Sequence, residues 1–85
     1  MSKEMVSGEF GVTILGRSGL RYRDGSKTAF VDAEMLAGVV DLVVYVNTIK
    51  AWEGTNRPVE NGEREQMIAN IRRVLEEHHI TVEFE

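Results

Sequence analysis

Apolar and polar residues alternate along three short segments near the N-terminus, and this period of two is typical of half-buried β-strands. The three segments are residues 10–14, 20–23 and 27–33. After the second segment, Asp24 and Gly25 predict a tight hairpin, because both residues tolerate a positive φ angle. Phe30 falls on the polar register of the third segment, so the pattern leaves the buried face of that strand open. Residues 34–38 then fit a short helical turn that ends at a glycine.

The most apolar segment of the chain runs from residue 41 to residue 52 and reads D-L-V-V-Y-V-N-T-I-K-A-W. Its β-branched and aromatic residues predict a buried central strand over residues 41–50. Both faces of this strand are apolar, so we expect other elements to cover each face at least in part. Tyr45 is interpreted as a core residue. Trp52 is either a lid on the core or a contact residue, and the polar loop of residues 53–59 follows it.

A helix is predicted to begin near Asn61, which is interpreted as its N-cap. Glu63 lies in the first turn, where the helix dipole favours a negative charge. Apolar residues recur at helical spacing and form one stripe, and Asn70 is placed away from it. The stripe consists of Met67, Ile68, Ile71, Val74 and Leu75. Residues 80–85 alternate again and predict a last strand.

These elements predict an α+β fold with the order β-β-β-β-α-β. We expect an antiparallel β-sheet of about five strands with one long C-terminal helix packed on one face, because this arrangement buries both apolar stripes. The helix returns the last strand to a place beside the central strand. A chain of 85 residues makes one domain. We expect this α+β domain to span residues 9–85, behind a flexible N-terminus of residues 1–8.

The composition narrows the classes of partner. The chain contains no cysteine, which excludes disulfides and thiolate chemistry and fits a cytoplasmic location. No apolar segment approaches the roughly 20 residues of a membrane span, so no membrane partner is expected. The net charge of −4 disfavours a nucleic-acid partner, because phosphates repel an acidic domain. Four basic residues near the first turns are interpreted as a solvated face: Arg17, Arg21, Arg23 and Lys27.

The residues that carry chemistry do not form a motif. His78 and His79 are adjacent on the predicted helix, where side chains point about 100° apart, so they make a poor metal site. Asp32 and Glu34 share one face if their strand is regular, and two such carboxylates can act as acid and base. Nothing in the pattern predicts their burial, so an enzyme that uses Asp32, Glu34 or His78 is the least favoured hypothesis. We expect no catalytic residue, no metal and no cofactor.

Six stretches of the chain carry a family resemblance. They are Y-R-D-G-S (22–26), V-D-A-E-M-L-A-G (31–38), D-L-V-V-Y-V-N-T-I-K-A-W (41–52), P-V-E (58–60), E-R-E-Q-M-I-A-N-I-R-R-V-L (63–75) and I-T-V-E-F-E (80–85). In order, spacing and character, they resemble a family of small immunity proteins from bacterial polymorphic toxin systems, the one numbered seventy-four. The resemblance covers residues 20–85, roughly.

The resemblance implies an α+β, cytoplasmic and non-enzymatic protein that protects the producing cell by binding a cognate toxin domain. An acidic domain would present complementary charge to a basic toxin. For this contact we expect Trp52, Glu53, Asn56 and Arg57, with Asp32 and Glu34 as the second choice. The alternative hypothesis is a self-associating structural or regulatory module, a homodimer in which an exposed edge strand pairs with a second copy.

Overall fold

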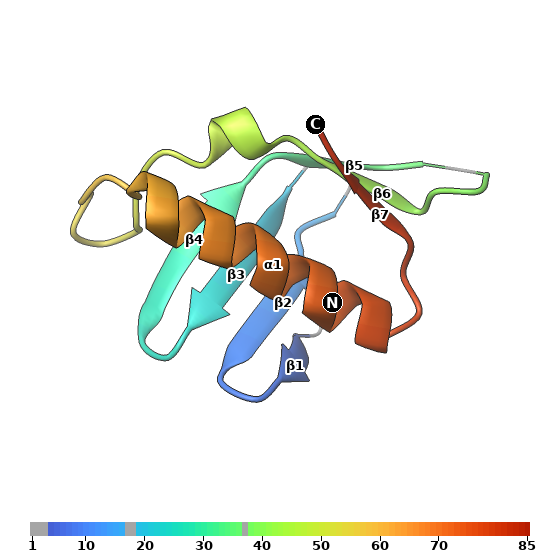
Figure 1. Ribbon diagram of the computed structural model, residues 1–85, viewed down its shortest axis with the longest axis horizontal. Helices are drawn as coiled ribbons and strands as arrows, with labels where there is room; N and C mark the ends of the chain where they lie inside the picture. The colour runs from blue at the N-terminus through green and yellow to red at the C-terminus, as the bar shows by residue number, and fades with distance from the viewer. Residues whose placement is uncertain (1–3, 17–18, 37) are drawn as a thin grey trace.

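The computed structural model describes residues 4–16, 19–36 and 38–85. Over these residues, the chain forms an α+β fold with one α-helix, a four-stranded antiparallel sheet and a three-stranded mixed sheet. In Figure 1, helix α1 crosses in front of the four-stranded sheet, and the three-stranded sheet lies along the top of the view. The predicted class is therefore confirmed. The expected single sheet of about five strands is wrong, and the chain builds two sheets.

The first sheet has the strand order β1-β2-β3-β4. Its strands are β1 (Met5–Ser7), β2 (Phe10–Ile14), β3 (Leu20–Asp24) and β4 (Lys27–Val31). Strand β1 lies within residues 1–8, which we expected to be a flexible N-terminus, and it pairs with β2 from Met5 onward. The sheet therefore begins before residue 9.

The hairpin between β3 and β4 is confirmed, and Gly25 in its turn has a φ angle of +61°. The register aligns Val12, Tyr22 and Ala29 across the three longer strands, and all three are buried. Phe30 is 42% exposed, so the buried face of β4 is the one that carries Ala29 and Val31. The sequence Arg17-Ser18-Gly19 also predicts a turn between β2 and β3, and residues 17 and 18 of it lie outside the described residues.

The second sheet has the strand order β5-β6-β7. It consists of β5 (Ala33–Met35), β6 (Leu42–Val44) and β7 (Val82–Phe84). The chain leaves the first sheet at Asp32, and the predicted strand over residues 27–33 is thereby divided between the two sheets. The helical turn expected over residues 34–38 is wrong, since Glu34 and Met35 pair with β6. As predicted, the last strand lies beside the central strand, parallel to it.

The central strand is shorter than predicted, because it ends at Val44 rather than at residue 50. A 3-10 helix, η1 (Val46–Thr48), follows it. The Thr48 hydroxyl donates to the Tyr45 carbonyl oxygen at 2.6 Å and accepts the backbone N–H of Asp32 at 3.0 Å. Such local side-chain bonds offer the backbone an alternative to a strand, which explains why an apolar run did not continue as one.

Helix α1 (Asn61–Glu77) begins where it was predicted, but Glu60 rather than Asn61 is the N-cap. Glu60 and Glu63 form a reciprocal capping box, which satisfies two backbone N–H groups at the helix start. Asn70 is buried with the apolar stripe, and our placement of it away from the stripe was wrong. Strand β7 follows the helix, so α1 is late in the chain but not strictly C-terminal.

The core lies between the first sheet, α1 and the inner side of the second sheet. This core contains Tyr22 and Val31 of the first sheet, Ile71 of α1 and Val44 of β6. Trp52 covers one end of it. The Asn70 amide donates to the Tyr22 hydroxyl at 2.8 Å inside this core. Within the described part of the chain, no helix is long and apolar enough to cross a membrane.

Candidate partner-binding surfaces

Trp52 forms the edge of the first candidate surface. Its side chain is 4% exposed and lies against Tyr22, with ring centroids 6.4 Å apart. The indole N–H points to a Glu63 carboxylate oxygen at 3.4 Å. Of the two interpretations of this tryptophan, the lid on the core is therefore the one that the structure supports, and a role in partner contact stays a prediction.

The loop of residues 53–57, called here the Trp52 loop, is held firmly at its base. The Trp52 N–H donates to the Arg57 carbonyl oxygen at 2.8 Å, and the Asn56 N–H donates back to the Trp52 carbonyl oxygen at 3.1 Å. The Glu53 N–H donates to Thr28 of β4 at 2.9 Å. Asn56 adopts a left-handed φ of +56°, which asparagine tolerates better than most residues. The side chains of Glu53, Asn56 and Arg57 are thus presented to solvent by an ordered backbone.

Charges around the Trp52 loop are balanced within the molecule. Glu53 pairs with Arg21 at 3.0 Å, and this hydrogen bond lowers the pKa of the Glu53 carboxyl. Glu63 lies 3.9 Å from Arg57 and 4.0 Å from Lys27, whose ammonium also sits 4.8 Å from the Trp52 ring centroid. The pKa of Glu63 is lowered chiefly by the backbone N–H of Glu60. A charged group of a partner that approaches this surface would therefore find carboxylates and cations that already pair with each other.

Two shallow pockets flank Lys27 and Trp52. One of about 150 Å³ extends toward Asp24 and Gln66, and the other, of about 300 Å³, extends toward Arg57. Small-molecule sites commonly occupy about 300–1,000 Å³, so these pockets fall at or below that range. The predicted basic cluster is dispersed among such ion pairs, since Arg21 pairs with Glu53 and Arg23 with Glu4. Arg17 lies outside the described residues.

The second candidate surface is the outer side of the β5-β6-β7 sheet. Register places Glu34 of β5 and Glu83 of β7 on either side of Val43. Because side chains alternate along a strand, Val43 points away from the face that carries the buried Leu42 and Val44. The same alternation places further polar residues on this outer side, and together they form what we call the acidic face: Asp32, Glu34, Asp41, Tyr45, Glu83 and Glu85.

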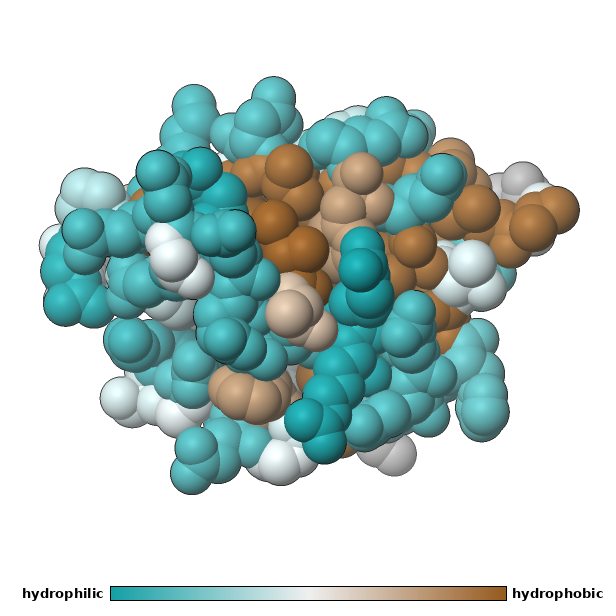
Figure 2. Space-filling model, in the orientation of Figure 1, coloured by the Kyte–Doolittle hydropathy of each residue, from teal (hydrophilic) through white to brown (hydrophobic). Residues whose placement is uncertain are grey.

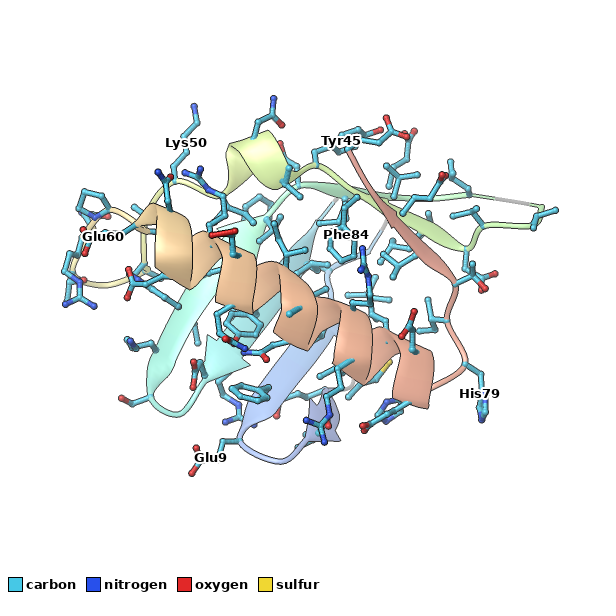
Figure 3. All side chains as sticks on the ribbon, viewed as in Figure 1. Glu9, Tyr45, Lys50, Glu60, His79 and Phe84 are labelled. Atoms are coloured by element: carbon cyan, nitrogen blue, oxygen red, sulfur yellow. The ribbon has the colours of Figure 1, made fainter. Side chains whose placement is uncertain are left out.

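Tyr45 lies on the acidic face just after β6, beside Glu34. Its hydroxyl donates to Glu34 Oε1 at 2.9 Å, and this bond raises the pKa of the Tyr45 phenol, with burial and the nearby Glu85 carboxylate acting in the same direction. Figure 3 shows Tyr45 at the top of the molecule and Phe84 on the opposite side of the sheet, toward α1. Asp41 accepts the backbone N–H of Thr81 at 2.9 Å, which ties the starts of β6 and β7 together.

The β5–β6 hairpin, beside the acidic face, ends in exposed apolar side chains. Met35 is 55% exposed, Leu36 is 42% exposed and Val39 is 92% exposed. In Figure 2, apolar residues form the right-hand end of the molecule, where Figure 1 places this hairpin. We call these three residues the hairpin end. Contiguous exposed apolar groups of this kind mark interaction sites more often than scattered ones do.

Sequence reasoning found part of the second surface. Alternation had placed Asp32 and Glu34 on one face, and both are exposed there. Tyr45 had been interpreted as core, and Asp41, Glu83 and Glu85 had been given no role. The sequence does contain a signal for them, because acidic residues alternate with apolar ones in residues 81–85 and Asp41 precedes the apolar run of β6. This signal indicates a shared face only when β6 and β7 are known to be neighbours.

The groups considered for catalysis are exposed. Asp32 and Glu34 belong to the open sheet face, and His78 lies at the far end of α1, where its ring Nδ1 is 2.9 Å from the Val74 carbonyl oxygen. Among the described residues, no three acidic or histidine side chains are placed to hold a metal ion together. Asp32 and Glu34 therefore do not share an enclosed site with His78.

Comparison with known proteins identifies a family to which the chain is similar. A family model described as Immunity protein 74 matches residues 12–85. The match begins eight residues before the point from which the resemblance had been traced, so it includes strand β2. No curated protein and no solved structure matches the chain.

Proposed function

Because the chain belongs to the Immunity protein 74 family, we propose that it neutralises a cognate toxin domain by binding directly to it. The family match over residues 12–85 carries this proposal, since it implies an immunity protein and therefore a toxin that the protein counteracts. In this proposal the protein acts in the cytoplasm of the producing cell, stoichiometrically and without changing a covalent bond in the toxin.

Physical features of the chain support inhibition by contact. The net charge is −4, and a complementary potential speeds the encounter of two proteins and helps to select the partner. A stable interface buries about 800 Å² on each partner. Two exposed regions of the fold are the candidates for such an interface, the Trp52 loop and the acidic face.

The two regions would contribute differently. The Trp52 loop would contact a toxin through Glu53, Asn56 and Arg57, because Trp52 itself is nearly closed off from solvent. Its ordered backbone would lose little conformational freedom on binding, which favours affinity. The acidic face would contact the toxin through exposed carboxylates, including Asp32 and Glu34.

Co-expression in bacteria tests the proposal. The toxin domain encoded by the neighbouring gene is expressed from an inducible plasmid, with and without this protein on a second plasmid. We expect cells that contain both to grow at the rate of uninduced cells and to yield a complex on affinity purification of either partner. Cells that stop growing although the immunity protein is abundant and folded would contradict the proposed function.

A further inference from the structure

We infer that the acidic face and the hairpin end together form the toxin-binding surface, and that the toxin presents a basic surface with an apolar pocket to them. This inference rests on the proposed function and adds to it the place of contact and the chemistry of the partner. It favours the second of the two candidate surfaces over the Trp52 loop.

The acidic face is a sheet face that no helix or other strand of the described residues covers in Figure 1, although Val43 beneath its side chains is only 5% exposed. Helix α1 and the first sheet pack on the inner side of β5-β6-β7, and in Figure 1 no element lies above the sheet on its outer side. Opposite residues on neighbouring strands are about 5 Å apart, and alternate residues along one strand about 7 Å apart. Five carboxylates therefore share a small area: Asp32, Glu34, Asp41, Glu83 and Glu85.

Over the described residues, the carboxylates of the acidic face belong to those that form no ion pair, as do Glu9 and Glu76, which lie elsewhere. Glu4, Glu53, Glu63 and Glu77 each form an ion pair with a lysine or arginine. Over the ranges that the structure covers, no basic side chain pairs with a carboxylate of the acidic face. Glu34 and Glu83 are separated by the intervening β6, about 10 Å, and Asp41 lies diagonal to both, so these like charges repel one another across the face without lying directly opposite. A partner that brings arginine or lysine to this face relieves that repulsion, so binding is favoured by an interaction that the free protein lacks.

A basic protein surface fits this face better than other occupants do. A nucleic acid or a second copy of the same face would bring further negative charge. A single metal ion needs ligands that converge on one point, and the described carboxylates are spread along three strands without such a group. Tyr45 adds a side chain that is both apolar and polar, and tyrosine is frequent among binding hot spots.

The hairpin end supplies the apolar part of the interface. Leu36 comes directly after β5, two residues beyond Glu34, and its N–H donates to the Asp41 carbonyl oxygen at 3.0 Å, so the hairpin end adjoins the acidic face. The Val39 side chain is 92% exposed and has almost no apolar contact of its own to lose. Burying it in a pocket of the toxin would remove its whole apolar surface from water, which is the largest gain that a side chain of this size can make.

The test compares two double variants that both bring the net charge from −4 to zero. Glu34→Lys with Glu83→Lys changes the acidic face. Glu9→Lys with Glu76→Lys changes exposed acids elsewhere, and Figure 3 shows Glu9 at the end of the molecule opposite Tyr45. Each variant is titrated against the purified toxin domain from the neighbouring gene by surface plasmon resonance. Circular dichroism first establishes that both variants are folded.

For the face variant we expect the dissociation constant to rise at least about tenfold, mainly through slower association that depends on salt. For the control variant we expect less than about a threefold change, because charges outside an interface add little to its affinity. As a second probe, Val39→Ser is expected to speed dissociation at unchanged stability, since Val39 is exposed in the free protein.

The outcomes separate the inference from the proposed function. If the unmodified protein binds the toxin and the face variant binds equally well, or both double variants weaken binding alike, the inference is wrong and the proposed function stands. If Glu53→Ala with Arg57→Ala abolishes binding while the face variant does not, the Trp52 loop is the interface. If the unmodified protein neither binds the toxin domain nor protects the cells, the proposed function is wrong, and the inference with it.

Discussion

The hydrogen bond between Tyr22 and Asn70 joins the first sheet to α1 inside the core, and its removal should be measurable. Tyr22 is 1% exposed and Asn70 is 5% exposed. Asn70 Nδ2 donates to the Tyr22 hydroxyl at 2.8 Å, while Asn70 Oδ1 accepts from Gln66 at 3.0 Å. The substitution Tyr22→Phe deletes the acceptor with almost no change in volume and leaves the Asn70 amide without it.

A buried polar group that loses its partner destabilises a protein by about 1–3 kcal/mol. We expect Tyr22→Phe to lower the free energy of unfolding by about 1–2 kcal/mol, the lower part of that range. The loss is smaller than the maximum because the variant has no hydroxyl to remove from water when it folds. With a urea dependence of roughly 1 kcal/mol per molar for a chain of this size, the midpoint should fall by about 1–2 M. Fluorescence of the single buried tryptophan, Trp52, reports the transition.

A double-mutant cycle gives the decisive comparison. Asn70→Leu alone leaves the Tyr22 hydroxyl with only a 3.5 Å contact to Asp24, so it too should destabilise. In the double variant both polar groups are gone, and stability should recover to within about 1 kcal/mol of the unmodified protein. Glu65→Ala is the matched control, because Glu65 is exposed on the same helix and is not part of this hydrogen-bonded group. Additive losses, or a shift below about 0.3 kcal/mol for Tyr22→Phe, would refute the reasoning.

Four further predictions follow from the same structure. Burial raises the pKa of Tyr22 to about 12 from 10.0, so the contribution of the neutral phenol to stability is complete below pH 10 and is lost as the pH rises toward 12. Urea midpoints measured across that range should fall in the unmodified protein and should fall less in Tyr22→Phe. The pKa of Glu63 is lowered from 4.5, so its contribution to stability is present above that pH and is lost as the pH falls through the folded-state value. Glu63→Gln should have a lower urea midpoint at pH 7, and its midpoint should decline less as the pH is lowered. A decline equal to that of the unmodified protein would count against the role of Glu63. Asn56 has a φ of +56°, so thermal unfolding should show little change for Asn56→Gly and a loss of roughly 1 kcal/mol or more for Asn56→Val, with equal losses contradicting the left-handed assignment. The second sheet ends in β7, a strand of three residues that carries Glu83, so sedimentation velocity should give a monomer at high micromolar concentration, and a dimer would favour the self-associating module.

The parts of the fold that were predictable are those with a local cause. The turn at Gly25 and Ser26 fixes its hairpin because glycine readily adopts the positive φ angle of +61° found there. The spacing from Met67 to Leu75 fixes the helix because only a period near 3.6 places those residues on one side. The packing of the helix against a sheet followed from the two apolar stripes that had to be covered.

The division into two sheets depends on contacts between distant segments. Residues 27–35 alternate almost without interruption, and the break at Asp32 is set by its bond to the Thr48 side chain, 16 residues later. The early end of β6 has the same origin, because Thr48 also bonds back to Tyr45. Strand propensity, which depends on the residue types within a segment, does not include such a bond, and the predicted strand over residues 41–50 was therefore too long.

The candidate site was predictable to a similar extent. Alternation was enough to put Asp32 and Glu34 on one face, whereas Glu83 joins them only because β7 returns beside β6. Trp52 was chosen for its residue type, but tryptophan contributes strongly both to cores and to interfaces, so the residue type alone does not distinguish the two roles. Its placement over Tyr22 could be decided only by the tertiary structure.

The central claim is that this protein inhibits a toxin by occupying its surface and not by altering it. Titration of toxin activity with increasing amounts of the protein tests that claim most directly. Direct binding predicts that activity falls linearly, reaches its minimum at one molecule of protein per toxin domain, and stays constant with time. Loss of activity that continues with time at a large molar excess of toxin, or activity that persists at equimolar and higher amounts of the protein, would contradict the claim.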